Sequence, residues 1–161
     1  MTKSAVFWVN VEQDPVFIRV KGRACYLNSE ALSRFIQLSI EKGFKRFVVD
    51  FSECSGMDST FLGILAGAAL DIKEKVQQGE LVLTQLVNRN LELVRNLGLH
   101  RVVKVAMGPI GVGASNCSCG LDPSLPPSDD LILRAHQNLV RANPENYEHF
   151  QDVISYLSAH A

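Results

Sequence analysis

Apolar residues in the first 107 positions alternate or cluster in short runs that are typical of β-strands. Two runs near the N-terminus, Val6–Val11 and Val16–Val20, predict a pair of strands joined by a tight turn, with Gly22 ending the second. The run Arg46–Phe51 is almost continuously apolar, as in a strand buried on both faces. Two shorter runs predict the remaining strands, at Leu81–Leu83 and Val102–Val105.

Between these runs, apolar residues recur at helical spacing and are bounded by capping and breaking residues. Three stretches show this pattern: from Asn28 or Ser29 to Gly43, from Ser59 to about Val76 after a turn at Ser55–Ser59, and from Asn88 or Asn90 to Gly98. The resulting order β-β-α-β-α-β-α-β predicts an α/β fold with a mixed, mostly parallel sheet and crossover helices.

Beyond residue 107 the chain changes character. Glycine and proline are frequent up to residue 127, and two further helices are expected after that, capped by Ser128 or Asp129 and by Asn143. We therefore expect three parts: a domain over 1–107, a linker over 108–127 and a C-terminal helical hairpin over 128–161. A short hairpin cannot bury both of its faces within itself, so one side of the second helix is expected to face protein. That side carries Tyr147, Phe150, Ile154 and Leu157.

Composition narrows the class of protein. The chain has 161 residues, of which 47% are hydrophobic, enough for one folded domain with an appendage. A net charge of -1 argues against nucleic acid as a partner, because phosphate binding requires a basic excess. The uncharged run Ser59–Leu70 is too short to span a bilayer, and residues 1–5 do not lead into an apolar signal segment. We therefore expect a cytoplasmic protein without a membrane partner.

The charge is distributed unevenly. Residues 1–107 carry 14 Lys and Arg against 11 Asp and Glu, whereas residues 108–161 carry 2 against 6, so the two parts are +3 and -4. The four cysteines are expected to be free thiols in this compartment. Cys117 and Cys119 lack the spacing of a zinc site, and we expect neither a metal nor a cofactor.

The sequence around the start of the long helix concentrates the candidate chemistry. Asp58, Ser59 and Thr60 fall at the first helical turn, where backbone N–H groups are free and the helix dipole is positive. Asp, Ser and Thr are also preferred helix-capping residues, so capping is the simplest interpretation. A phosphate on Ser59 would be favoured at this position and would change the local surface by about two negative charges.

At these residues the chain resembles a STAS domain, the family of bacterial anti-sigma factor antagonists. The resemblance covers roughly residues 4–107, and the stretch from Asn88 to Leu99 resembles the family's last helix and its Gly-Leu turn. The family's central motif is matched by Asp50, Met57, Asp58, Ser59, Thr60, Leu62 and Gly63.

The resemblance implies a function and a site. It implies an anti-sigma factor antagonist that regulates transcription by partner switching, with Ser59 as the phosphorylated residue. The implied partners are an anti-sigma factor with serine protein kinase activity and a serine phosphatase, and a homodimer is left open. The residues expected to bind the partner or to support the site are Asp50, Met57, Asp58, Thr60 and Phe61.

Phe61 departs from the family pattern, which has glycine at this position. We expect a bulky side chain here either to block kinase docking or to anchor a different partner. Asp50 is expected to end a strand or to bond a turn.

Two other functional classes remain as alternatives. The first is a STAS-type adaptor or small-ligand sensor that is never phosphorylated. The second is a hydrolase with Ser59 as nucleophile, which is disfavoured because the Gly-x-Ser-x-Gly elbow is missing and neither His100 nor His136 has an evident orienting context. We therefore expect that the protein is not an enzyme.

Overall fold

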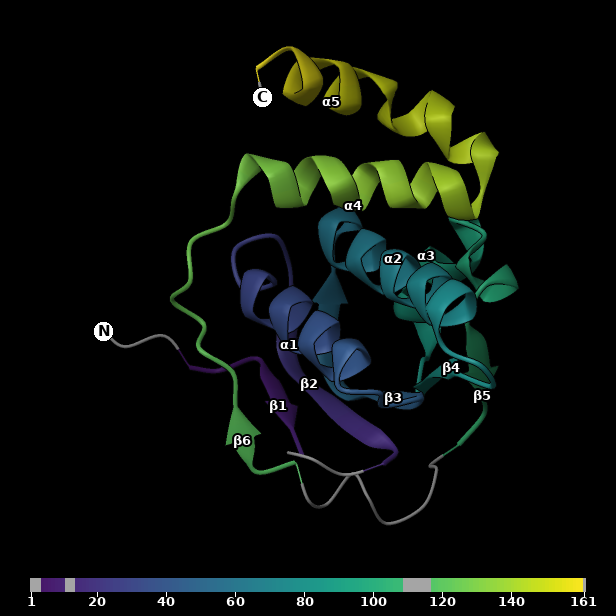
Figure 1. The fold of residues 1–161 in the computed structure, drawn as a ribbon. Coiled ribbons are helices and arrows are strands. Elements are labelled where there is room, and N and C mark those ends of the chain that lie inside the picture. Colours follow the sequence, from purple (N-terminus) through teal and green to yellow (C-terminus); the bar gives the residue numbers. More distant parts are fainter. Residues whose placement is uncertain (1–3, 11–13, 109–116, 161) are drawn as a thin grey trace.

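The computed structural model describes residues 4–10, 14–108 and 117–160. Its helices and strands follow the predicted order up to the fifth strand and continue with a short strand that the sequence pattern did not predict (Figure 1). The elements are β1 (Phe7–Val9), β2 (Val16–Ala24), α1 (Glu30–Glu41), β3 (Arg46–Met57), α2 (Ser59–Lys75), β4 (Glu80–Thr84), α3 (Asn88–Asn96), the 3₁₀ turn η1 (Leu99–Arg101), β5 (Lys104–Ala106), β6 (Cys119–Gly120), α4 (Asp129–Ala142), the 3₁₀ turn η3 (Pro144–Asn146) and α5 (Tyr147–Ala159).

Within the described residues the strands form one sheet in the order β5-β4-β3-β2-β1-β6. The pairings β2–β3, β3–β4 and β4–β5 are parallel, whereas β1 pairs antiparallel with both β2 and β6. The predicted mixed, mostly parallel sheet is therefore confirmed. β6 comes from the stretch expected to be a linker and adds an edge strand beside β1.

Two predicted strand ends are wrong. β2 does not end at Gly22 but continues to Ala24, and β3 continues through the expected turn to Met57. The two strands stay paired over this extension, with shifts in register on either side of Gly22. Gly22 has a φ of +104°, which a residue without Cβ adopts at no steric cost, so the pairing continues past Gly22 through an irregular register instead of stopping.

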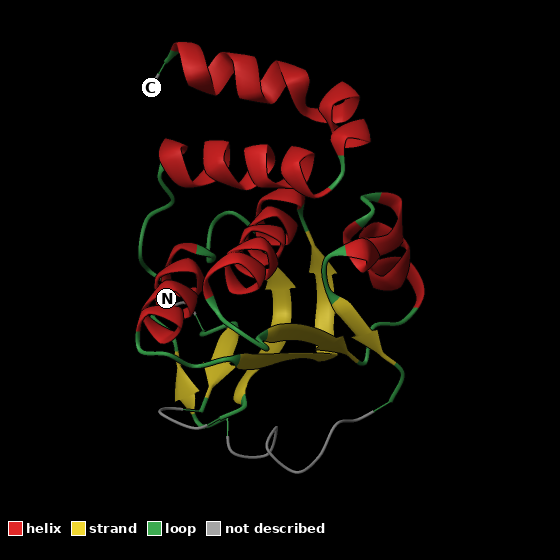
Figure 2. Ribbon diagram, turned by 45° about the vertical axis from the view of Figure 1, so that its right-hand side comes forward, coloured by secondary structure: helices red, strands yellow, loops and turns green. Residues whose placement is uncertain are grey.

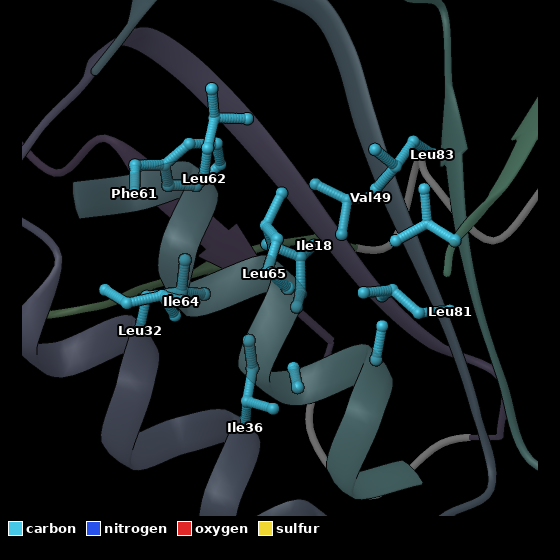
Figure 3. Close-up of a cluster of buried hydrophobic side chains, with 14 of the residues drawn as sticks. Ile18, Leu32, Ile36, Val49, Phe61, Leu62, Ile64, Leu65, Leu81 and Leu83 are labelled. Atoms are coloured by element: carbon cyan, nitrogen blue, oxygen red, sulfur yellow. The ribbon is translucent and has the colours of Figure 1, made fainter. Parts of the chain in front are cut away.

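The main core lies between the sheet and the two helices α1 and α2, which cover one face of it (Figure 2). Figure 3 shows how side chains of these helices interdigitate with those of β2, β3 and β4. The labelled members are Ile18, Leu32, Ile36, Val49, Phe61, Leu62, Ile64, Leu65, Leu81 and Leu83. Burying such a side chain contributes about 1.5–3 kcal/mol. A smaller cluster occupies the opposite face of the sheet, around Phe17, Val48 and Val82.

The C-terminal helices form a further layer on top of this core. α4 lies across α2, and α5 lies on the outer side of α4 (Figures 1 and 2). The prediction that the apolar side of α5 faces protein is wrong for Tyr147, which is 52% exposed. Phe150, Ile154 and Leu157 are half-buried, because α5 packs chiefly against α4 and no residue of α5 is fully buried.

Candidate functional site at the start of helix α2

Asp58 fixes the junction between β3 and α2. Its backbone is extended, and its Oδ1 accepts a hydrogen bond from the backbone N–H of Phe61 at 2.9 Å, which is an N-cap contact. Its second oxygen, Oδ2, accepts from the backbone N–H of Tyr26 at 2.8 Å. The capping interpretation of Asp58 is confirmed, and the same carboxylate also ties the segment after β2 to the start of α2.

Ser59 is the first residue of α2, and its hydroxyl contacts a residue far away in the sequence. Its Oγ lies 2.9 Å from Nε2 of His136 on α4, and the imidazole is only 4% exposed. Ser59 itself is half-buried. The residue expected to be phosphorylated is therefore partly covered by α4 in this structure.

His136 has an orienting context that the sequence did not reveal. Its Nδ1 lies 2.7 Å from the carbonyl oxygen of Ile132, one turn earlier on α4. Because a carbonyl can only accept, Nδ1 is the donor, which in the neutral ring leaves Nε2 to accept the Ser59 hydroxyl. The ring of Phe150 packs edge-on against the imidazole, with centroids 5.1 Å apart. These contacts enclose the ring and hold it against Ser59. The other histidine considered, His100, is exposed on η1.

The expectation that Phe61 lies at the surface, as a block or as an anchor, is wrong. Its side chain is fully buried, stacked on Phe7 at 5.7 Å and edge-on to Phe51 at 6.1 Å. Two residues correspond to about 200° around a helix, so Phe61 points toward the sheet when Ser59 points away from it. Met57 and Thr60 are buried as well.

Asp50 lies away from this site. It follows Val48 by two residues on β3 and therefore shares the face of the sheet opposite to α2. Its carboxylate is paired with Nε of Arg19 at 3.3 Å and accepts the backbone N–H of Ser52 at 2.8 Å. The expectation that Asp50 ends a strand is wrong, because β3 continues to Met57, and the contact of Asp50 with Ser52 lies within that strand and not in a turn.

The cysteines form no cross-link in the structure. All four thiols are free, and burial raises the pKa of the Cys54 and Cys117 thiols above the usual value. In the part of the chain that is described, no three His, Cys, Asp or Glu side chains gather in a way that could hold a metal ion.

Sequence reasoning missed His136 as a member of the site. The signal that points to a covering element lies in α2, where Gly63 and Gly67 recur one turn apart in a stretch, residues 61–70, that is otherwise entirely apolar. Such a stretch of helix has no polar side to present to water, so it requires a second cover. Nothing in the local pattern says which segment provides that cover.

The comparisons with known proteins agree with this geometry. The family model of the STAS domain matches residues 8–109, which is most of the chain, so the protein belongs to the STAS domain family. The matched region ends before α4 begins, so both C-terminal helices lie outside it.

Three solved structures share the fold. The anti-sigma factor antagonist SpoIIAA in its unphosphorylated form is 20% identical with a TM-score of 0.52, covering 65% of this chain and 89% of its own. The phosphorylated form of SpoIIAA, described as a Bacillus cell fate determinant, is 20% identical with a TM-score of 0.52, covering 62% of this chain and 90% of its own. A putative anti-sigma factor antagonist from Thermotoga maritima is 17% identical with a TM-score of 0.55, covering 65% of this chain and 87% of its own.

In the described residues, no helix is long and apolar enough to cross a membrane.

Proposed function

We propose that this protein is an anti-sigma factor antagonist that binds its partner through the surface around the start of α2 when Ser59 is unphosphorylated. The observation that carries the proposal is the position of Ser59. It is the first residue of a helix capped by Asp58, on a STAS fold whose solved neighbours include an antagonist studied in both phosphorylation states.

The chemistry of the position supports control by phosphate. A phosphoserine at the first turn of α2 lies at the positive end of the helix dipole, which favours its negative charge. The added charge of about -2 stands beside the Asp58 carboxylate. A partner packed over this helix end must desolvate that charge, and an unpaired buried charge costs several kcal/mol.

The partners that fit this proposal are an anti-sigma factor of the serine kinase type and a serine phosphatase, in a cytoplasmic pathway that controls transcription. We do not propose catalysis by the Ser59–His136 pair. His136 is buried, and its second nitrogen is bonded to a carbonyl of its own helix, which is the geometry of a packing contact.

The test compares full-length variants for binding to an anti-sigma kinase from the same organism. Ser59→Asp should weaken binding by about tenfold or more, whereas Ser59→Asn, which has the same shape without the charge, should bind nearly as well as the parent. Ser55→Asp places the same charge on an exposed residue of β3 and serves as a control. Incubation with the kinase and ATP should add one phosphate, and Ser59→Ala should abolish that addition.

Equal affinity of the parent, Asp and Asn chains would contradict phosphate control. That result would instead favour the adaptor or ligand-sensor function.

A further inference from the structure

The outer face of α2 is covered along most of the helix. Every residue from Thr60 to Ala69 is buried, although the sheet can cover only one side of a helix. The other side carries Gly63 and Gly67, and α4 lies on it. Because this side is apolar, exposing it to water is unfavourable, and it requires a protein cover in any state of the molecule.

The backbones of α2 and α4 lie very close together where the two helices cross. A Cβ on Gly63 would lie 2.2 Å from the carbonyl oxygen of Ala135, and one on Gly67 would lie 2.3 Å from Nδ2 of Asn138. The face of α2 therefore accepts a helix that has a small residue where the two cross. Ala135 provides that residue in α4.

Leu131 and Leu139 of α4 are buried in the core beneath it, and polar contacts are added at the edges of the interface. Arg141 pairs with Glu74 at 3.2 Å, with both side chains largely exposed, and such a pair contributes about 0–1 kcal/mol. The amide of Asn146 donates to the carbonyls of Leu97 at 2.9 Å and Leu139 at 2.8 Å. A pocket of about 60 Å³, partly open to solvent, lies along the seam where α1, α2 and α4 meet.

Ser59 lies under one end of this seam. The hydroxyl that a kinase must reach is hydrogen-bonded to the buried His136. A protein that docks over the start of α2 needs the space that α4 fills. Docking of α4 and docking of a partner at Ser59 therefore exclude each other.

We propose that α4 occupies the face of α2 to which the partner binds. An anti-sigma partner then reaches Ser59 by displacing α4 with a helix of its own that has a small residue where it crosses α2. This inference rests on the proposed function and adds its regulation. The chain in this structure is the closed form, and its affinity for the partner is reduced by the fraction of molecules in which α4 is docked.

The first test locks α4 in place with a disulfide. A Cβ built on Gly67 lies 3.6 Å from the Cβ of Asn138, within the range of about 3.5–4.5 Å that a disulfide spans. The full-length double variant Gly67→Cys/Asn138→Cys should lose at least about tenfold in partner affinity when oxidised and recover it with reductant. Asn138→Cys alone is the matched control and should not respond to reductant. Equal binding by the oxidised and reduced double variant overturns the inference.

The second test opens the face without a partner protein. Leu139→Asp in the full chain places a charge on a fully buried position of α4 and should undock the helix, whereas Leu157→Asp on α5 should not. A synthetic peptide of residues 128–146 should bind the Leu139→Asp chain at least about tenfold more tightly than the parent, and adding Gly63→Ala should remove that binding. Equal peptide binding by the parent and Leu139→Asp overturns the inference.

The two proposals fail in different ways. If the peptide binds the Leu139→Asp chain but Ser59→Asp does not change partner binding, the docking of a helix on α2 is supported and phosphate control is contradicted. Loss of partner binding in Ser59→Asp, with no effect of the disulfide lock, would sustain phosphate control and contradict occupation by α4.

Discussion

The two C-terminal helices, α4 and α5, have a similar pattern of apolar residues but lie in very different surroundings. Both carry an apolar stripe. Ser128 caps α4 directly, whereas Asn143 caps the 3₁₀ turn η3 that leads into α5. α4 buries four side chains, Leu131, Ala135, His136 and Leu139. α5 buries none, and Tyr156 is 64% exposed. An apolar stripe thus predicts that a helix packs against another part of the protein, but it does not predict how much of each side chain is buried.

The difference follows from what lies on each side. α4 has α2 below it and α5 above it, so its stripe and part of its flanks are enclosed. Among the described residues, α5 packs chiefly against α4 and η3, and most of its residues are exposed. We therefore expect α4 to be part of the cooperative structure and α5 to contribute mainly as a partial lid over His136 and its neighbours.

Truncation should produce the largest effect. A chain ending at Pro127 loses both helices and exposes the glycine face of α2, so we expect a folded but less stable domain that binds an apolar dye and self-associates. A chain ending at Asn146 loses α5 alone and should keep α4 docked, with little dye binding. Thermal unfolding, dye fluorescence and sedimentation of the two chains check this. The comparison fails if both truncated chains behave alike.

Deleting one side chain on each helix sharpens the same contrast. Leu139 is fully buried and Leu157 is half-buried, and both become smaller by the same atoms on substitution with alanine. Leu139→Ala should cost about 2–4 kcal/mol through lost burial and a cavity, whereas Leu157→Ala should cost about 1 kcal/mol or less. Denaturant unfolding, read together with hydrogen exchange of α4, measures both. Similar costs at the two positions would show that α5 is as deeply integrated as α4.

The close crossing of α2 and α4 predicts an unusual sign for a glycine substitution. Alanine at an interior helix position normally stabilises by about 1 kcal/mol, but a Cβ on Gly63 collides with the backbone of Ala135. Gly63→Ala should therefore destabilise the full chain by about 1–3 kcal/mol. At Gly67 the collision is with the movable side chain of Asn138, so Gly67→Ala should cost less. Unfolding midpoints that rise for Gly63→Ala would contradict the close packing.

The hydrogen bond between Ser59 and His136 should have the smallest effect. A net contribution of about 0.5–1.5 kcal/mol is usual for such a bond. A double-mutant cycle of Ser59→Ala and His136→Ala in the full chain should give a coupling energy in this range. A coupling near zero would show that the two side chains do not stabilise each other in solution.

Local patterns were sufficient for most of the fold. The apolar runs near Val16 and Val49 and the helical spacing after Ser59 each depend on neighbours within a few residues. The element order up to β5 and the capping role of Asp58 could therefore be predicted. The ends of β2 and β3 could not, because a strand continues for as long as its neighbour pairs with it. Gly22, a local stop signal, was overridden by that pairing.

The candidate site shows the same difference between contacts that are local in the sequence and contacts that are not. The sequence by itself determined that Asp58 and Ser59 begin a helix, because capping is a contact between residues three positions apart. Only the tertiary structure decided that Phe61 points into the core and that His136 meets Ser59, since both outcomes depend on which surfaces lie opposite α2. The sheet takes the side of α2 that carries Phe61, and α4 takes the side that begins at Ser59. The contact between Ser59 and His136 joins residues 77 positions apart, and no periodicity in a single stretch of chain encodes such a distance.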